Sequence, residues 1–324
     1  MIKGLVSVII PTYNRAAYVV DAVRSAQAQT YPLKQIIVVD DGSCDETAQR
    51  LAELNLKDVE YLYQSNRGQG AARNHGLRLA DGEYIASLDS DDLWDEDFLA
   101  RSVECLEAFT LDFVFTNWTK VRGGQLHRSE WLRDGKWKGY QKNPQGDWFI
   151  LTPAEVRKLF LNLCPSPSSS LLIRRDSIVS GWGAHMQIAD DWYMILEMAL
   201  HRPCKGAFSL TPRWRKRVDG QNVYDGRPFT ESVKRLHLHD CPIFRRDFDS
   251  LLTRREKIML ALREAAYRLR LLLHEAAETD LAARFKIPAL VARLRGPTEA
   301  SAHNPERAER LFVEEDQGSS AHLS

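Results

Sequence analysis

Residues 83–92 read EYIASLDSDD, a short apolar run that ends in three carboxylates within four positions. The run predicts a buried β-strand, and the cluster Asp89, Asp91 and Asp92 begins where that strand stops. Carboxylates this close repel one another, so they are stable together only when they are solvated or neutralised, and a divalent cation with oxygen ligands neutralises them well. The alternative is a helix N-cap, because aspartates at a helix start accept hydrogen bonds from free backbone amides.

The chain before this run alternates strand-like and helical patterns. The strands that we predict are Leu5–Ile10, Gln35–Val39, Val59–Tyr63 and Glu83–Leu88, with helices over 16–28, 45–54 and 70–79 between them. Regular β-α-β alternation predicts an α/β fold with a mainly parallel sheet flanked by helices. Each predicted strand ends in a polar cluster, and ligands of such sheets bind at the carboxyl ends of the strands. We therefore expect the four clusters to meet at one site.

Composition excludes several classes of protein. The 324 residues are 44% apolar and carry a formal net charge of zero, so no global field attracts nucleic acid. Five scattered cysteines without a Cys-x-x-Cys pair argue against a disulfide framework or a zinc knuckle and favour a reducing compartment. No run reaches the roughly 18–20 apolar residues of a membrane span. The sequence predicts a soluble, cytoplasmic protein.

Four sequence blocks carry a family resemblance. They are VIIPTYNR at 8–15, VDDGS at 39–43, NRGQGAARN at 66–74 and LDSDD at 88–92. In this order and spacing they resemble the family 2 glycosyltransferases, which have the GT-A fold. A plain Asp-Gly turn is the alternative for the second block alone. The resemblance implies an enzyme that moves a sugar from a nucleoside-diphosphate donor to an acceptor hydroxyl with inversion of the anomeric centre.

The resemblance also implies residues for the nucleotide part of the donor. Tyr13 would lie against the base beside Pro11 and Thr12, and Asp41 would accept a hydrogen bond from the base, with Asp40 in a more structural role. Tyr13 and Asp41 suit a pyrimidine, which favours UDP without excluding GDP or dTDP.

The resemblance also implies that Arg73 reaches the donor's ribose or diphosphate and that Arg15 and Ser90 belong to the nucleotide-sugar site; for Arg73 a solvated helix arginine is the alternative. Asp91 would hold Mn²⁺ or Mg²⁺ against the diphosphate oxygens, with Asp89 or Asp92 completing the set. Such a metal offsets the charge on the leaving group.

A second acidic pair lies well downstream, in IADDWY at 188–193. Similar enzymes carry a Glu-Asp pair there, at a helix start and before an aromatic residue. Asp191 matches the general base, which takes the proton of the acceptor hydroxyl. Asp190 stands where the family has glutamate and is a candidate second acid, with a less certain role because its side chain is shorter.

Two other features depart from the family or stay ambiguous. Relatives often carry an Arg-x-His segment on a loop over the donor, whereas 214–221 reads WRKRVDGQ without a histidine. Arg215 and Arg217 could meet diphosphate or lie on a solvated edge strand. Four tryptophans in the middle of the chain would stack on an acceptor sugar or, more commonly, fill a core; they are Trp118, Trp131, Trp137 and Trp148.

The resemblance and the patterning together divide the chain. We predict a GT-A domain over 1–228, with a nucleotide-binding half at 1–110 and an acceptor half at 111–228. A helical segment follows at 229–295 and a disordered tail at 296–324. The basic helical segment would touch the inner membrane beside a lipid-linked acceptor, or would form a dimer or a solvated cap. The acceptor would be a saccharide or a lipid-linked molecule.

Three other functions share single features with this sequence. A dinucleotide-dependent oxidoreductase is rejected, because its glycine motif would follow the first strand and precede the acid, whereas Gly68 and Gly70 follow the third strand. A sugar nucleotidyltransferase is an alternative that usually has a glycine-rich basic loop after the first strand, which is absent here. A non-catalytic nucleotide-sugar-binding protein is the other alternative.

Overall fold

The computed structural model describes residues 1–54, 58–128, 135–218 and 227–278. The chain forms two compact units, Met1–Asp219 and Gly220–Ser324, and each is described by itself. The predicted domain boundaries, including the one at residue 228, stay predictions, and the tail at 296–324 lies outside the described residues.

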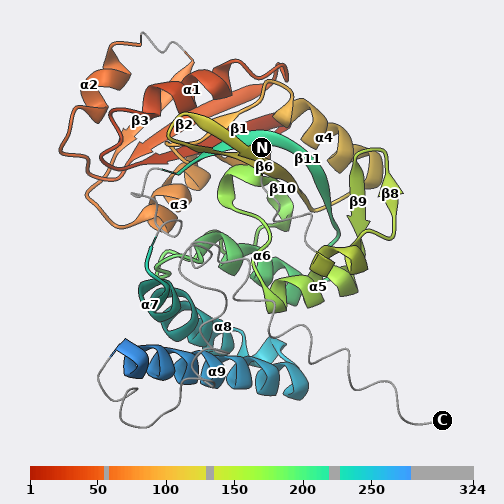
Figure 1. Cartoon of the computed structure of the whole chain (residues 1–324). Helices are drawn as coiled ribbons and strands as arrows, with labels where there is room; N and C mark the ends of the chain where they lie inside the picture. The colour runs from red at the N-terminus through yellow and green to blue at the C-terminus, as the bar shows by residue number, and fades with distance from the viewer. Residues whose placement is uncertain (55–57, 129–134, 219–226, 279–324) are drawn as a thin grey trace. The chain divides into compact units, whose positions relative to one another are not determined.

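The first part of unit one is a parallel sheet in the order β3-β2-β1-β4 (Figure 1). Its strands are β1 (Ile2–Thr12), β2 (Lys34–Asp40), β3 (Val59–Tyr63) and β4 (Gly82–Ser87), and its helices are α1 (Val19–Gln27), α2 (Thr47–Ala52) and α3 (Gln69–Leu79). This part confirms the predicted β-α-β alternation. The carboxyl ends of β1, β2 and β4 therefore lie along one edge of the sheet.

The sheet continues through strands of both directions. Antiparallel β10 (Leu171–Arg174) joins β4 to β6 (Phe113–Arg122), and β11 (Gly206–Arg217) runs parallel to β6. The remaining strands are β5 (Leu93–Trp94), β7 (Gln125–Arg128), β8 (Pro144–Gln145) and β9 (Trp148–Leu151). The helices of this part are α4 (Phe98–Phe109), α5 (Pro153–Asn162) and α6 (Asp190–His201), with short 3₁₀ turns η2 (Gly135–Tyr140), η3 (Ser168–Ser170) and η4 (Arg175–Ser177). The mainly parallel α/β fold is confirmed.

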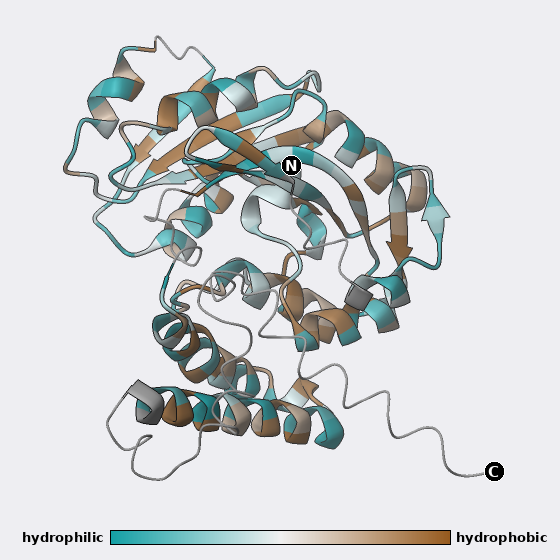
Figure 2. Cartoon of the chain, viewed as in Figure 1, coloured by the Kyte–Doolittle hydropathy of each residue, from teal (hydrophilic) through white to brown (hydrophobic). Residues whose placement is uncertain are grey.

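Buried β-branched residues hold the sheet to its helices. Ile9 of β1 and Val38 of β2 have no exposed surface, and the apolar side of α1 recurs every three or four residues, from Val19 through Ala22 and Val23 to Ala26. Brown, apolar stretches accordingly alternate with polar ones along the strands in Figure 2. This rigid core fixes the positions of the loops at the carboxyl edge.

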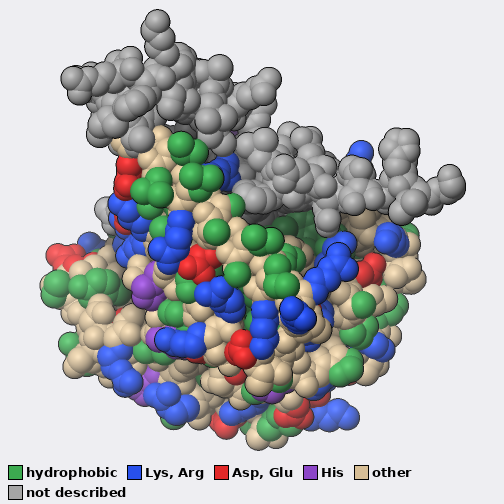
Figure 3. Space-filling view, turned by 90° about the horizontal axis from the view of Figure 1, so that it is seen from below, with side chains coloured by type: hydrophobic (Ala, Val, Ile, Leu, Met, Phe, Trp, Pro, Cys, Tyr) green, Lys and Arg blue, Asp and Glu red, His purple; other side chains and the backbone are tan. Residues whose placement is uncertain are grey.

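Unit two is helical, which confirms the predicted helical C-terminal segment. Its elements are α7 (Phe229–Ser232), the π-helix η5 (Val233–Asp240), α8 (Cys241–Asp247), η6 (Asp249–Leu251) and α9 (Arg254–Glu278). Tyr267 and Leu271 of α9 pack against Val233. Basic, acidic and apolar side chains mix on the face that carries these helices (Figure 3). Across the described residues, no helix is both long and apolar enough to cross a membrane.

Candidate functional site

The loop after β1 and the turn after β2 are joined at the carboxyl edge. The amide of Asp41 donates to the carbonyl of Thr12 over 2.8 Å, and the amide of Asn14 donates to Ser43 Oγ over 2.9 Å. Pro11 and Thr12 are buried, whereas Tyr13 is 46% exposed. The Tyr13 ring is thus free to cover a flat ligand, as predicted for a base.

The two aspartates after β2 have different surroundings. Asp40 Oδ1 accepts from the amide of Ser43 and Asp40 Oδ2 from the hydroxyl of Tyr61, both over 2.8 Å, so Asp40 holds the turn. Gly42 follows with φ of +83°, a conformation that suits glycine. Asp41 Oδ1 accepts from the amide of Arg67 and from Gln64, and Asp41 Oδ2 accepts from the amide of Gly68. A carboxylate accepts about four hydrogen bonds. One acceptor position of Asp41 Oδ2 therefore remains for a ligand.

The three acids after β4 come together as predicted. Asp89, Asp91 and Asp92 each offer an oxygen, and these oxygens all lie within 4.8 Å of one another. Such a set of hard oxygen ligands fits Mn²⁺ or Mg²⁺. Arg15 Nε lies 3.6 Å from Asp91 Oδ2, so Arg15 reaches this cluster from the β1 loop. Ser90 lies between the acids in sequence and is buried.

Burial and mutual repulsion perturb these carboxyl groups. Burial, with help from the charge of Asp89, raises the pKa of Asp91 to about 6, against the opposing charges of Arg15 and Lys216. Burial also raises the pKa of Asp92 well above its usual range. When the three carboxylates are ionised, their negative charges repel one another, and a bound divalent cation would remove this repulsion.

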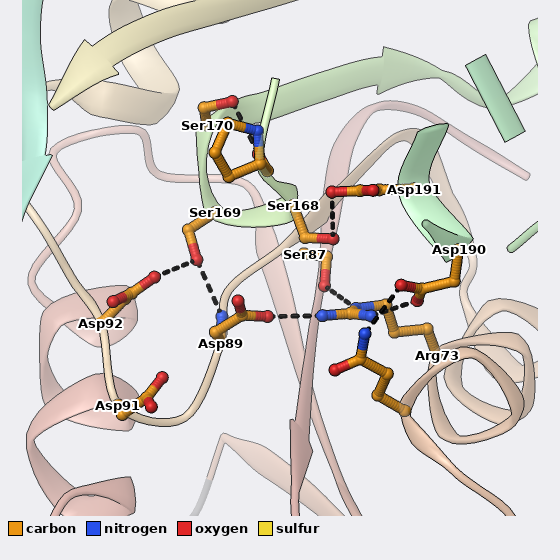
Figure 4. Close-up of polar contacts among 12 residues, drawn as sticks. Arg73, Ser87, Asp89, Asp91, Asp92, Ser168, Ser169, Ser170, Asp190 and Asp191 are labelled. Carbon is orange, nitrogen blue, oxygen red and sulfur yellow. Dashed lines mark hydrogen bonds and ion pairs between the residues drawn. The ribbon is translucent and has the colours of Figure 1, made fainter. Parts of the chain in front are cut away.

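The η3 turn contacts the acids on both sides of the site (Figure 4). Ser169 Oγ donates to Asp92 Oδ2 over 2.7 Å and accepts from the amide of Asp89 over 3.0 Å. Ser168 Oγ lies 3.4 Å from Asp191 Oδ2. The three serines form a turn whose hydroxyls bond to these acids and, for Ser170, to the carbonyl of Pro167.

Asp190 and Asp191 open α6, as the sequence predicts. Asp190 is buried, and its two oxygens are engaged by Gln69 Nε2, over 2.8 Å, and by Arg73. Asp191 is half-buried, with Oδ1 accepting from the amide of Trp192 over 2.7 Å. Burial and the neighbouring charge of Asp190 raise the pKa of Asp191 to about 7, although Arg73 opposes the rise. Asp191 therefore titrates where a general base works best.

Arg73 is buried among the acids. The resemblance implied a contact with the donor's ribose or diphosphate, and that role stays a prediction; the side chain is only 2% exposed, and each of its three nitrogens meets another residue. Nε donates to Ser87 over 3.1 Å, one terminal nitrogen contacts Asp89 over 2.5 Å, and the other contacts Asp190.

The side chains of the other candidate residues have partners elsewhere, although the backbone amide of Arg217 donates to Asp92 Oδ1 over 3.2 Å. Arg215 pairs with Asp95 over 3.2 Å, and the guanidinium of Arg217 covers the Tyr18 ring at 4.2 Å. The tryptophans Trp118, Trp137 and Trp148 are at most 7% exposed and belong to the core, while Trp131 lies outside the described residues.

Sequence reasoning missed three contributors to the site. Ser169 supports two acids, Gln69 holds Asp190, and the charge of Lys216 lowers the pKa of both Asp91 and Asp92. The run of serines at 168–170 and the basic segment at 215–217 were visible in the sequence, but only the pairing of β11 beside β6 and β5 shows which basic residue faces the cluster.

The comparisons with known proteins agree on one family. A family model described as glycosyl transferase family 2 matches residues 7–178. The putative teichuronic acid biosynthesis glycosyltransferase TuaG of Bacillus subtilis is 40% identical over 121 residues, which are 36% of this chain and 48% of TuaG. Chondroitin synthase of Escherichia coli is 42% identical over 110 residues, 33% of this chain and 16% of the synthase. The chain thus spans less than half of either relative.

Solved structures share the fold. A mannosyltransferase from Pyrobaculum calidifontis, in complex with GDP-Man and Mn²⁺, superposes with a TM-score of 0.58 at 21% identity, over 98% of this chain and 89% of that one. Residues 1–349 of S. aureus TarS, in complex with UDP-GlcNAc, give a TM-score of 0.54 at 18% identity, over 88% and 77%. At these identities the likeness concerns the fold alone.

Proposed function

The chain belongs to glycosyl transferase family 2, and on that premise we propose that it transfers a sugar from a nucleoside-diphosphate donor to an acceptor hydroxyl with inversion. The observation that carries the proposal is the convergence of Asp89, Asp91 and Asp92 at one edge of the sheet, with Asp191 opening a helix beside them. Relatives that make bacterial polysaccharides are consistent with a role in polysaccharide or glycoconjugate synthesis.

The donor half of the proposal rests on the β1 and β2 loops. The exposed ring of Tyr13 would cover the base, and the remaining acceptor position of Asp41 would bind an N–H of it. Uracil offers such an N–H at N3, and thymine and guanine offer one too; of the three, we favour UDP. Arg15, which lies beside Asp91, would contact the diphosphate.

The chemical step would need a general base for the acceptor hydroxyl and a positive charge beside the leaving nucleoside diphosphate. Asp191 would remove the proton of the acceptor hydroxyl while the oxygen of that hydroxyl attacks the anomeric carbon. The bond between the anomeric carbon and the diphosphate oxygen breaks in the same step. A single attack of this kind inverts the anomeric centre. A divalent cation held by Asp89, Asp91 and Asp92 would offset the charge on the departing nucleoside diphosphate.

Calorimetry tests this function directly. We expect UDP to bind with Mn²⁺ more tightly than GDP or dTDP, and Asp91→Asn to lose the metal-dependent part of that affinity while it stays folded. Binding of none of the three nucleotides would refute the proposal. If Asp91→Asn binds Mn²⁺ and nucleotide as well as the parent, the acids form only a helix cap.

For unit two we propose pairing with a second copy of this chain in preference to membrane contact. Five exposed residues of α9 follow a 4-3-4-3 spacing and, at about 100° per residue, occupy an arc of about 80°; they are Ile258, Leu262, Ala265, Leu269 and Leu272. A narrow heptad stripe is typical of a helix-pairing seam, whereas a membrane-surface helix has a broader apolar side.

A further inference from the structure

Arg73 lies between the two acidic groups of the site (Figure 4). It projects from α3, and its side chain is 2% exposed. One terminal nitrogen contacts Asp89, which follows β4, and the other contacts Asp190, which opens α6. Segments that are far apart in the sequence therefore meet on one guanidinium group.

Burial of this cation requires both carboxylates. Taking a guanidinium out of water is costly unless opposite charges and hydrogen bonds replace the water. Burial alone would lower the pKa of Arg73, but the charges of Asp190 and Asp89 outweigh it and raise that pKa further. Arg73 is thus permanently charged, and its fork has two separated ends that a lysine ammonium lacks.

Other residues of α3 also contact Asp190 and the segment that precedes it. Gln69, one turn before Arg73, donates to the other oxygen of Asp190. Asn74 exchanges two hydrogen bonds with the backbone of Trp182, at 2.7 and 2.9 Å, in the segment that leads to α6. A Cβ on Gly70 would lie only 3.0 Å from the carbonyl oxygen of Gly183, so the glycine permits this close approach.

We propose that Arg73 is a positioning residue, which fixes the metal-binding acids relative to Asp191 and does not bind the donor. The inference rests on the proposed function and changes the role that the family resemblance gave to this arginine. Asp190 is held on both oxygens, so Asp191 is left as the acid that meets the acceptor. The shorter Asp190 fits because α3 approaches it closely.

The test compares Arg73→Lys with Arg78→Lys, the same change at an exposed position of the same helix. For Arg73→Lys we expect kcat to fall 10- to 100-fold, because a lysine reaches only one of the two carboxylates. UDP affinity without metal should stay within twofold of the parent, because the side chain does not touch the nucleotide. Arg78→Lys should change neither quantity.

Two results would overturn the inference. A loss of metal-free UDP affinity in Arg73→Lys would make the arginine a donor ligand, and an unchanged kcat would remove its positioning role. If the parent binds no nucleotide, the proposed function fails instead.

Gln69→Ala gives a second test, because it keeps the ion pairs of Arg73 and removes only the hydrogen bond to the other oxygen of Asp190. It should lower kcat three- to tenfold with unchanged UDP affinity. This variant remains decisive if Arg73→Lys does not fold, because an unchanged kcat in Gln69→Ala would then count against the proposal.

Discussion

At the residue scale, the adjacent acids Asp190 and Asp191 illustrate how surroundings divide two roles. Asp190 has both oxygens engaged by Gln69 and Arg73. Asp191 keeps one oxygen with only a long contact, 3.4 Å from Ser168 Oγ. A carboxylate that is already bonded on both oxygens is a poor proton acceptor, so the division follows from geometry.

Substitution should separate these roles. We expect Asp191→Asn to lower transfer by about 10²–10⁴-fold, the usual contribution of a general base, with donor and Mn²⁺ affinity retained. Asp190→Asn should instead lower the free energy of unfolding by about 3 kcal/mol, because it removes a charged partner of a buried arginine. Initial rates, calorimetry and thermal unfolding of both variants provide the measurements. Equal loss of transfer without a loss of stability in Asp190→Asn would contradict the assignment.

The pH dependence of transfer should report Asp191. The groups that face this carboxyl group are Asp190, Asp89, Arg73, Ser168 and Cys164. Since burial and Asp190 raise its pKa to about 7, and the base acts only when ionised, kcat should rise as the pH increases through about 7 and then level off.

Measurements at saturating Mn²⁺ would keep the metal-binding carboxylates ionised, so that they do not contribute to the profile. NMR of the product, which identifies the anomeric configuration of the new linkage, tests inversion separately. A flat profile between pH 5 and 8 would contradict an acid with a raised pKa, and retained configuration would exclude direct attack.

Sequence patterns located the acids of the site but not the contacts that join them. The acids at 89, 91, 92, 190 and 191 were all named from the sequence. The position of Arg73 was not, because its burial depends on the approach of α6 to α3, and no local pattern encodes that contact.

At the element scale, the η3 turn connects the two acidic groups. Ser169 supports Asp92 and the backbone of Asp89, while its carbonyl oxygen accepts from Trp94 Nε1 over 2.7 Å. Ser170, which is equally buried, bonds only to Pro167 among the contacts observed. The turn thus offers two similar serines with different partners.

We expect Ser169→Ala to weaken Mn²⁺-dependent UDP binding about tenfold, because a hydrogen bond to a charged group contributes about 1.5–3 kcal/mol. Ser170→Ala is the matched control and should change that affinity less than twofold. Calorimetry of the two variants with UDP and Mn²⁺ measures these affinities. Equal losses would mean that both substitutions only loosen the turn.

The secondary structure followed the sequence where patterns were local. Strand β3 has the predicted bounds, Val59–Tyr63, whereas α5 was missed. A capping box between Thr152 and Glu155, with Pro153 at the first helical position, was a signal that could have found it. A strand was expected over 168–173 and β10 overlaps it, but its antiparallel place between β4 and β6 was not predictable, because its partners are more than fifty positions away in the sequence.

At the scale of the whole molecule, α9 has two opposite apolar sides. Leu260, Tyr267 and Leu271 are buried on one side within unit two. The stripe from Ile258 to Leu272 lies on the other and is 52–65% exposed at its four large residues. A helix that had only to pack within its own unit would not need the second side, and polar residues would be expected there.

We therefore expect the parent to be a dimer and the double substitution Leu262→Glu with Leu269→Glu to give a monomer in light scattering at micromolar concentration. Charged residues in the centre of a seam are desolvated on pairing, which opposes association. Leu126→Glu is the control, since Leu126 is 67% exposed on β7 of unit one. It should remain a dimer.

The same variants separate assembly from chemistry. Because none of the proposed catalytic or metal-binding residues lies in unit two, Mn²⁺-dependent donor hydrolysis by the monomeric variant should stay within about threefold of the parent rate. A parent that is monomeric in solution but cosediments with anionic vesicles would assign the stripe to a membrane surface instead. Loss of hydrolysis in a folded monomer would show that pairing contributes to the active site.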